Sequence, residues 1–234
     1  MTREEFYLEL EKNNLLLNDV QKEGLHTYFH MLVEKNKVMN LTGITEEDEV
    51  YEKHFYDSIL FSFELDFNEK TLIDVGTGAG FPGLVLAICY PKLNVTLLEP
   101  LAKRCNFLSE VVNALKLKNA IVVNARAEDF VKTSRNKFDY ATARAVAKLN
   151  VLLELVMPLI KVKGQFVALK GKMGHEEVKE ATNALKLLDS KVESLQDVRL
   201  FTDNDSRVNV FIKKMKDTNL KYPRAYSKIK AKPL

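Results

Sequence analysis

The chain has 234 residues, of which 46% are apolar and 29% charged, and its 35 lysines and arginines against 32 aspartates and glutamates give a net charge of +3. This length and composition fit one globular domain with an appendage, and exclude a disordered, collagen-like or coiled-coil protein. The longest apolar run, residues 84–90, is far shorter than the ~20 residues that span a bilayer, and the acidic N-terminus is unlike a signal peptide, so we expect a cytoplasmic protein without a membrane span.

The first 66 residues carry a helical pattern. Over residues 19–39 the apolar side chains recur at three- and four-residue steps, which places them on one face of a helix, and Asn18 or Asp19 can cap its start. A shorter helix is expected over residues 46–63. Because no β-rich run interrupts this region, we interpret residues 1–66 as a helical appendage on the domain that follows.

From residue 70 onward, short apolar runs alternate with amphipathic stretches, which is typical of β-α units around a parallel sheet. The pattern predicts strands over residues 71–75, 95–99, 120–124, 138–143 and 165–170, with helices between them. After a helical stretch over 174–188, two strands at 192–200 and 207–214 lie too close together for a crossover helix. They predict an antiparallel hairpin closed by a turn over 202–206, and hence a Rossmann-like α/β fold with a seven-stranded, mostly parallel sheet.

Charge is distributed unevenly along the chain. Residues 1–66 hold six basic and fifteen acidic residues, a net charge of −9, whereas residues 213–234 hold eight basic residues and one acid, a net charge of +7. We divide the chain into the appendage 1–66, a domain over 67–216 and a basic tail over 217–234. A cationic tail favours a polyanionic partner such as nucleic acid, with a solvated tail as the alternative.

A glycine-rich segment, D-V-G-T-G-A-G-F-P-G at 74–83, joins the first predicted strand to the next helix. Gly76, Gly78 and Gly80 permit a tight turn and let a ligand approach the backbone. Glu99 ends the second predicted strand, where a carboxylate can accept hydrogen bonds from both hydroxyls of a ribose. The segment therefore predicts a nucleoside-containing cofactor.

Two cofactors fit this segment. Gly78, Gly80 and Gly83 satisfy the G-x-G-x-x-G pattern of NAD-dependent dehydrogenases, in which the glycines serve a pyrophosphate. The acidic Asp74, the glycines directly after the strand and the C-terminal hairpin favour S-adenosyl-L-methionine (AdoMet), whose amino acid end Asp74 can help hold. A turn that binds no ligand is the remaining alternative.

Several motifs that occur in one order along nearly the whole chain resemble those of the bacterial RsmG (GidB) family of small-subunit ribosomal RNA guanine-N7 methyltransferases. The motifs are N-L-T-G-I at 40–44, H-F-Y-D-S-I at 54–59, the glycine-rich segment at 74–83, L-L-E-P-L-A-K-R-C-N-F-L at 97–108, A-R-A-E-D-F at 125–130, A-T-A-R-A-V-A at 141–147, A-L-K-G at 168–171 and K-Y-P-R at 221–224. The resemblance implies an AdoMet-dependent enzyme that methylates N7 of a specific guanine in small-subunit (16S) ribosomal RNA, naked or within an assembling subunit. It implies AdoMet contacts at Gly76, Phe81, Ala127, Glu128 and Arg144, with Glu99 at the ribose. We expect a monomer.

Guanine N7 carries a lone pair and no proton, so its methylation needs positioning rather than a general base. Arg126, Arg144 and Lys170 lie at the carboxyl ends of the third, fourth and fifth predicted strands, where ligands bind in such sheets. We expect these three side chains to orient the guanine and its phosphates. Ion pairs with Glu128, Asp129 or Asp139 are the alternative for each of them.

The candidate RNA contacts lie on one predicted helix and in the tail: Lys103, Arg104, Lys221 and Arg224. Tyr222 and Tyr226 either stack on bases or pack the tail against the body. We expect no metal site, because His26 and His30 have a suitable spacing but no third ligand. His54 and Asp57 either pair locally or dock the appendage near the cofactor. A maturation factor without enzymatic activity, and an AdoMet enzyme acting on a protein or small molecule, are the other functions open at this point.

Overall fold

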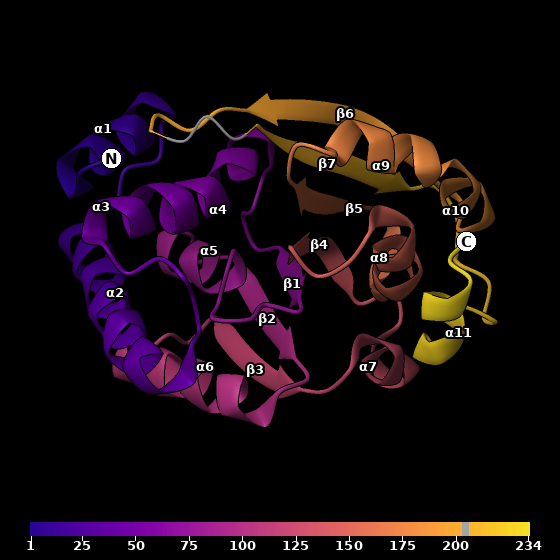
Figure 1. The fold of residues 1–234 in the computed structure, drawn as a ribbon, viewed down its shortest axis with the longest axis horizontal. Helices are drawn as coiled ribbons and strands as arrows, with labels where there is room; N and C mark the ends of the chain where they lie inside the picture. The colour runs from indigo at the N-terminus through magenta and orange to yellow at the C-terminus, as the bar shows by residue number, and fades with distance from the viewer. Residues whose placement is uncertain (203–205) are drawn as a thin grey trace.

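The protein, seen in a computed structural model that describes residues 1–202 and 206–234, is built around one seven-stranded sheet (Figure 1). The strands lie in the order β3-β2-β1-β4-β5-β7-β6. Their bounds are β1 Thr71–Val75, β2 Asn94–Glu99, β3 Ala120–Asn124, β4 Phe138–Arg144, β5 Ile160–Lys170, β6 Ser190–Val198 and β7 Arg207–Lys214. The first five strands are parallel, whereas β7 runs antiparallel to both β5 and β6. This confirms the predicted sheet and its C-terminal hairpin.

Four predicted strands differ from the observed ones in their bounds, β2 and β4 by a single residue at one end. Strand β5 begins five residues before its predicted start, because residues 160–164, which resemble a turn, continue the strand across a register shift against β4. Strand β6 begins and ends two residues earlier than expected. The turn predicted over 202–206 includes residues 203–205, which lie outside the described part of the chain.

Helices cover both faces of the sheet. Figure 1 shows α1 to α6 on one side, and α7, α8, α10 and α11 on the other. The helices are α1 Arg3–Lys12, α2 Asp19–Met39, α3 Glu47–Val50, the π-helix η1 Tyr51–Tyr56, α4 Asp57–Ile59, the 3₁₀ helix η2 Leu60–Glu64, α5 Gly83–Cys89, α6 Ala102–Ala114, α7 Ala127–Ser134, α8 Leu149–Val156, the 3₁₀ helix η3 Met157–Leu159, α9 Gly174–Glu180, α10 Thr182–Leu187 and α11 Tyr226–Ala231. Successive strand residues such as Leu72 and Ile73 belong to different buried clusters, one on each face.

The N-terminal helices form one layer of this body. Helix α2 has the predicted bounds; Asn18 caps its start and Asn40, in the left-handed conformation, ends it. The helix expected over 46–63 is present as α3, η1, α4 and η2 in succession. Apolar side chains of this layer share a buried cluster with α5 and α6, so residues 1–66 pack directly on the sheet domain.

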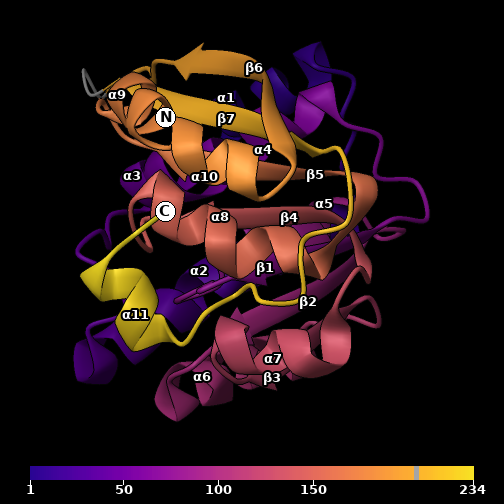
Figure 2. The same ribbon diagram turned by 90° about the vertical axis from the view of Figure 1, so that its right-hand side faces the viewer.

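The basic tail also packs on the body, as Figure 2 shows for its path from β7 past α8 to α11. Tyr222 and Ile229 are buried within it. Arg135 donates hydrogen bonds to the carbonyls of Thr218 and Tyr222. Of the two alternatives for Tyr222, packing against the body is therefore the one observed. No helix in residues 1–202 and 206–234 combines the length and apolar character needed to cross a membrane.

Candidate active site

Two adjoining cavities open where the central strands end. The first, the glycine-loop cavity, has a volume of about 470 Å³ and is walled by the turn after β1, the end of β2 and the segment after β4. The second, the β5-side cavity, has a volume of about 670 Å³ and is walled by the segments after β4 and β5, the start of β7 and part of η1. Both cavities share one partition, formed by His54, Arg144, Ala145 and Val146. Two ligands can therefore bind side by side here.

The glycine turn leaves one wall of the glycine-loop cavity open to a ligand. Gly76 and Gly78 have φ values of +72° and +62°, which favour glycine. A Cβ on Gly78 would have no neighbour closer than 4.0 Å. The Gly78 amide donates to Glu99 Oε2 at 3.0 Å, and the Leu101 amide donates to Glu99 Oε1, also at 3.0 Å. These bonds fix the Glu99 carboxylate in the cavity wall.

Asp74 and Gly80 shape the turn from behind and do not line either cavity. Asp74 is fully buried; Oδ2 accepts from the Gly83 amide at 2.8 Å and Oδ1 from Thr142 Oγ1 at 3.2 Å. Burial raises the pKa of Asp74 to about 6. A Cβ on Gly80 would lie 2.6 Å from the Tyr28 hydroxyl, which donates to the Ala79 carbonyl. Asp74 and Gly80 thus support the turn from the protein interior, and their expected ligand contacts stay predictions.

Thr77 is a wall residue that the motif analysis missed. It lies between the first two glycines of the turn and lines the glycine-loop cavity. Its hydroxyl is buried and has no hydrogen-bond partner within the described residues. The hydroxyl points into the protein and helps to lower the pKa of the buried Asp74, so we do not assign it to a ligand. The position of Thr77 inside the glycine motif is the feature of the sequence that could have identified it as a wall residue.

The partition between the cavities is built around Arg144, the last residue of β4. Its Nη1 donates to Asp57 Oδ2 at 3.0 Å and to the Lys53 carbonyl at 3.2 Å, and its Nη2 lies 3.2 Å from His54 Nδ1. The guanidinium also lies 5.0 Å from the centre of the Phe81 ring, on which His54 stacks at 4.4 Å. His54 and Asp57 thus dock the appendage at the cavity mouth, which was one of the two alternatives.

His54 is a neutral member of this partition. Burial, reinforced by the charge of Arg144, lowers the pKa of His54 to about 3. A neutral imidazole can accept a hydrogen bond from Arg144 at Nδ1 while Nε2, 2.7 Å from Thr42 Oγ1, is the protonated nitrogen. His54 therefore adds no positive charge to either cavity near neutral pH.

Comparison with known proteins identifies the family. A sequence profile described as "GidB: rRNA small subunit methyltransferase G" matches residues 21–204. The chain belongs to this family. Proteins named "Ribosomal RNA small subunit methyltransferase G" from Lactobacillus helveticus and Bacillus licheniformis are both 47% identical to it; the first match covers 100% of both chains, and the second covers 96% of this chain and 95% of the relative.

Solved structures similar to this family member share its fold. A SAM-dependent methyltransferase from Aquifex aeolicus matches 77% of this chain and 97% of its own, with 20% identity and a TM-score of 0.56. A 16S rRNA (adenine(1408)-N(1))-methyltransferase variant from Catenulisporales acidiphilia matches 68% of this chain and 89% of its own, with 16% identity and a TM-score of 0.53. The Rossmann-like methyltransferase fold expected from the sequence is confirmed.

Of the three cations expected to orient the guanine, two line the β5-side cavity. Arg144 does so from the partition, and Lys170 from the end of β5. Lys170 is buried, pairs with Glu177 Oε2 at 2.7 Å and donates to the Ala147 carbonyl at 2.6 Å. Arg126 instead lies outside both cavities, largely exposed, 3.9 Å from Glu128. The structure therefore does not bring Arg126 together with the other two.

The cofactor contacts that the resemblance implies are partly brought together. Gly76, Phe81, Glu99 and Arg144 all line the glycine-loop cavity. Ala127 and Glu128 begin α7 at the carboxyl end of β3, but line neither cavity.

The candidate RNA contacts are in different environments. Lys103 and Lys221 are exposed. Arg104 lines the glycine-loop cavity, 3.8 Å from Glu99 Oε2. Arg224 is bound to the fully buried Glu154, with Nε 2.8 Å from Oε1 and Nη2 2.6 Å from Oε2. The Arg224 guanidinium therefore holds the tail on the body, and an RNA contact at this residue stays a prediction.

Lys172 is a cation that sequence reasoning missed. It follows β5 in A-L-K-G-K, is exposed, and lines the β5-side cavity. Within the described part of the chain it makes no ion pair. The sequence could have indicated this residue, because it is a second lysine two residues after the end of the strand. No group of three or more metal-ligating side chains occurs among residues 1–202 and 206–234.

Proposed function

We propose that this protein is an AdoMet-dependent methyltransferase that methylates N7 of a specific guanine in small-subunit (16S) ribosomal RNA, either naked or in an assembling subunit. The observation that carries the proposal is the pair of adjoining cavities with one shared partition at Arg144. A methyl donor in the glycine-loop cavity and a base in the β5-side cavity would meet at this partition. Membership of the rRNA small subunit methyltransferase G family supports the substrate class. Action as a monomer remains a prediction.

The glycine-loop cavity suits AdoMet in two respects. Glu99 offers a carboxylate to the ribose hydroxyls, and Gly78 leaves space at the backbone. When bound, AdoMet supplies a methyl group that is activated by its sulfonium charge. The volume of about 470 Å³ lies within the range usual for such ligands.

A dinucleotide fits this turn less well. In dinucleotide-binding folds the pyrophosphate rests on the amide groups at the start of the helix after the first strand. Here the Gly83 amide at the start of α5 already donates to the Asp74 carboxylate. An anion in the same place would lose that donor and would meet a carboxyl group. This favours the methyltransferase over the dehydrogenase alternative.

The β5-side cavity suits a base with an attached phosphate. Guanine N7 has no proton to lose, so the residues only need to hold the base in line with the methyl group. The bonds to Asp57 and Glu177 fix Arg144 and Lys170 as parts of the wall. Lys172 is exposed and without an ion pair among the described residues, so we assign it to an RNA phosphate.

The experiment that tests this function is transfer of tritium from labelled AdoMet to ribosomal RNA from a strain that lacks the protein. We expect label in one guanine, located by mapping the modified base, and a comparison of naked RNA with small subunits will identify the preferred substrate. Label in protein or in small molecules would support the corresponding alternative. AdoMet binding without any transfer would support a maturation factor.

A further inference from the structure

One wall of the β5-side cavity is assembled from two segments that lie far apart in the sequence. Helix η1 of the appendage contributes Lys53 and His54. The chain around the start of β7 contributes Ser206 and Arg207. The width of the cavity therefore depends on how these two segments are held together.

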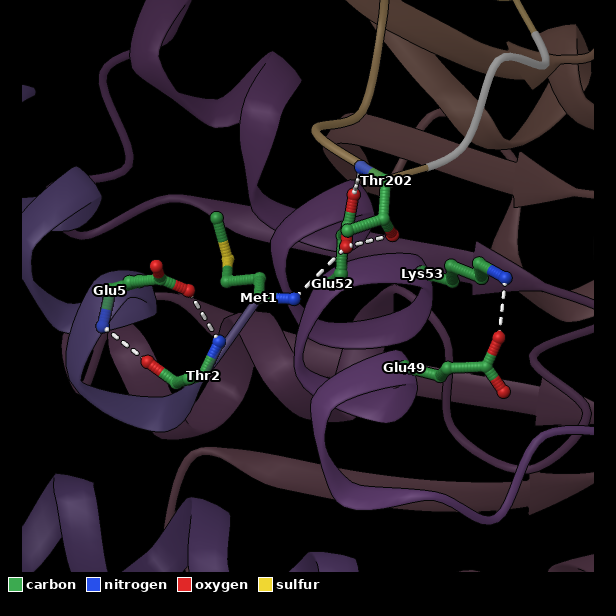
Figure 3. A network of polar contacts seen from close by, with 7 residues as sticks. All are labelled: Met1, Thr2, Glu5, Glu49, Glu52, Lys53 and Thr202. Carbon is green, nitrogen blue, oxygen red and sulfur yellow. Dashed lines mark hydrogen bonds and ion pairs between the residues drawn. The ribbon is translucent and has the colours of Figure 1, made fainter.

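The fully buried Glu52, next to Lys53 in η1, bonds to Thr202 (Figure 3), which follows β6. Val198, the last residue of β6, pairs with Arg207 at the start of β7, so Glu52 links η1 to the segment that carries Arg207. Its Oε1 accepts from the Thr202 amide at 2.7 Å, and its Oε2 accepts from the Thr202 hydroxyl at 2.5 Å. The amino group of Met1 lies 3.1 Å from Oε2. Burial raises the pKa of Glu52, but the hydrogen bonds from Thr202 and the charged amino group of Met1 together outweigh burial, and the net pKa is lowered. The side chain is therefore a carboxylate near neutral pH, and its bonds to Thr202 are charge-assisted.

Two further contacts join the same segments. The rings of Tyr56 and Phe201 lie 5.8 Å apart, and Arg207 Nε lies 3.3 Å from Asp57 Oδ1. The other oxygen of Asp57 holds Arg144, so a shift of the Arg207 segment would reach the partition between the cavities. Glu52 itself lines neither cavity, and its effect on a ligand is therefore indirect.

We propose that Glu52 is a positioning residue for the RNA substrate, which fixes the segment carrying Arg207 against η1 and so sets the separation of the two halves of the cavity wall. This inference rests on the proposed function. It places the determinant of RNA binding in a side chain that does not touch RNA. Loss of the carboxylate would loosen the RNA side of the site. The turn after β1 and the end of β2, which form the other walls of the glycine-loop cavity, lie on other segments and would keep their positions.

The test compares Glu52→Gln, Thr202→Val and Thr202→Ser in the methyl-transfer assay. Glu52→Gln removes the charge, Thr202→Val removes the hydroxyl donor, and Thr202→Ser keeps both donors. We expect the first two to raise KM for RNA about tenfold, equivalent to about 1.4 kcal/mol, with kcat and AdoMet affinity unchanged. Thr202→Ser should match the wild type. The double variant Glu52→Gln/Thr202→Val should raise KM for RNA no more than Glu52→Gln alone does, because both changes break the same link.

A matched control removes a buried hydrogen bond elsewhere. Tyr90→Phe loses the 2.7 Å contact with Ser62, which lies in neither cavity wall. It should lower the melting temperature and leave KM for RNA unchanged. If Glu52→Gln and Thr202→Val behave like this control, the inference is overturned while the proposed function stands. If the wild type transfers no methyl group to ribosomal RNA, the proposed function itself fails. Thr202→Val keeps the test decisive if Glu52→Gln does not fold.

Discussion

Replacing Arg224 by alanine tests whether this residue of the basic tail holds the tail on the body or contacts RNA. Arg224 donates to Glu154 through its backbone amide, Nε and Nη2, at 2.8, 2.8 and 2.6 Å. Glu154 lies in α8 and is fully buried. The alanine variant would keep only the amide donor, and would leave a carboxylate in the protein interior without its counter-charge.

The size of the effect follows from this burial. Removing one partner of a buried ion pair costs about 3–5 kcal/mol, mostly because the remaining charge is unpaired. For a chain of this length, each kcal/mol lowers the melting temperature by about 2–4 °C, so we expect a loss of roughly 6–20 °C. Adding Glu154→Gln to Arg224→Ala should restore part of the loss, because the interior then holds a neutral amide.

The assay is thermal unfolding, followed by methyl transfer at a temperature where the variant is still folded. Lys221→Ala is the matched control: Lys221 is an exposed cation of the same tail and should unfold like the wild type. At the permissive temperature, Arg224→Ala should bind RNA with the wild-type salt dependence. A melting temperature near that of the wild type, together with a reduced salt dependence, would refute the structural role of Arg224.

Three further predictions concern the cavities and the turn. Lys172→Ala should reduce the log–log salt slope of RNA binding by about 0.7, whereas Lys92→Ala, an exposed lysine near the opposite ends of the strands, should leave the slope unchanged. Glu99→Ala should weaken AdoMet binding about 10- to 100-fold in calorimetry, the loss of roughly 1.5–3 kcal/mol of charge-assisted hydrogen bonding, with RNA binding retained. Because burial raises the pKa of Asp74 to about 6, the folded state binds its proton more tightly than the unfolded state. Relative to Asp74→Asn, the wild type should therefore lose about 2 kcal/mol of unfolding free energy as the pH rises from 4 to 7, measured by urea titration; a flat difference would contradict the raised pKa.

The sequence was sufficient for the sheet and for α2, because their apolar residues follow the periods of strands and helices and their ends carry capping residues such as Asn18. It was insufficient for the helical turns between α2 and β1. There Val50, Tyr51, Glu52 and Phe55 are all buried, so no single polar face marks the period. The ion pair that anchors the tail was not predicted for another reason: a count of charges says nothing of Glu154, which lies 70 residues before its partner Arg224.

The sequence predicted part of the candidate site, as it predicted part of the fold. Local motifs placed Gly76, Gly78 and Glu99 together because the carboxyl ends of neighbouring parallel strands meet at one edge of the sheet. They could not distinguish glycines that face a ligand from Gly80, which is required by the Tyr28 hydroxyl of a distant helix. The partners of Arg144 were likewise hidden, since Asp57 lies 87 residues away in the chain.

The bond from the Tyr28 hydroxyl to the Ala79 carbonyl makes the first helices inseparable from the methyl-donor pocket. A fragment trimmed to residues 67–234 would lose this anchor, and one side of Phe81, now covered by Tyr28 and Phe55, would be left bare. We therefore expect residues 67–234 alone to hold the glycine turn less firmly than the whole chain does. Any chimera that borrows a different N-terminal region must recreate the Tyr28 hydroxyl at the same point above the turn.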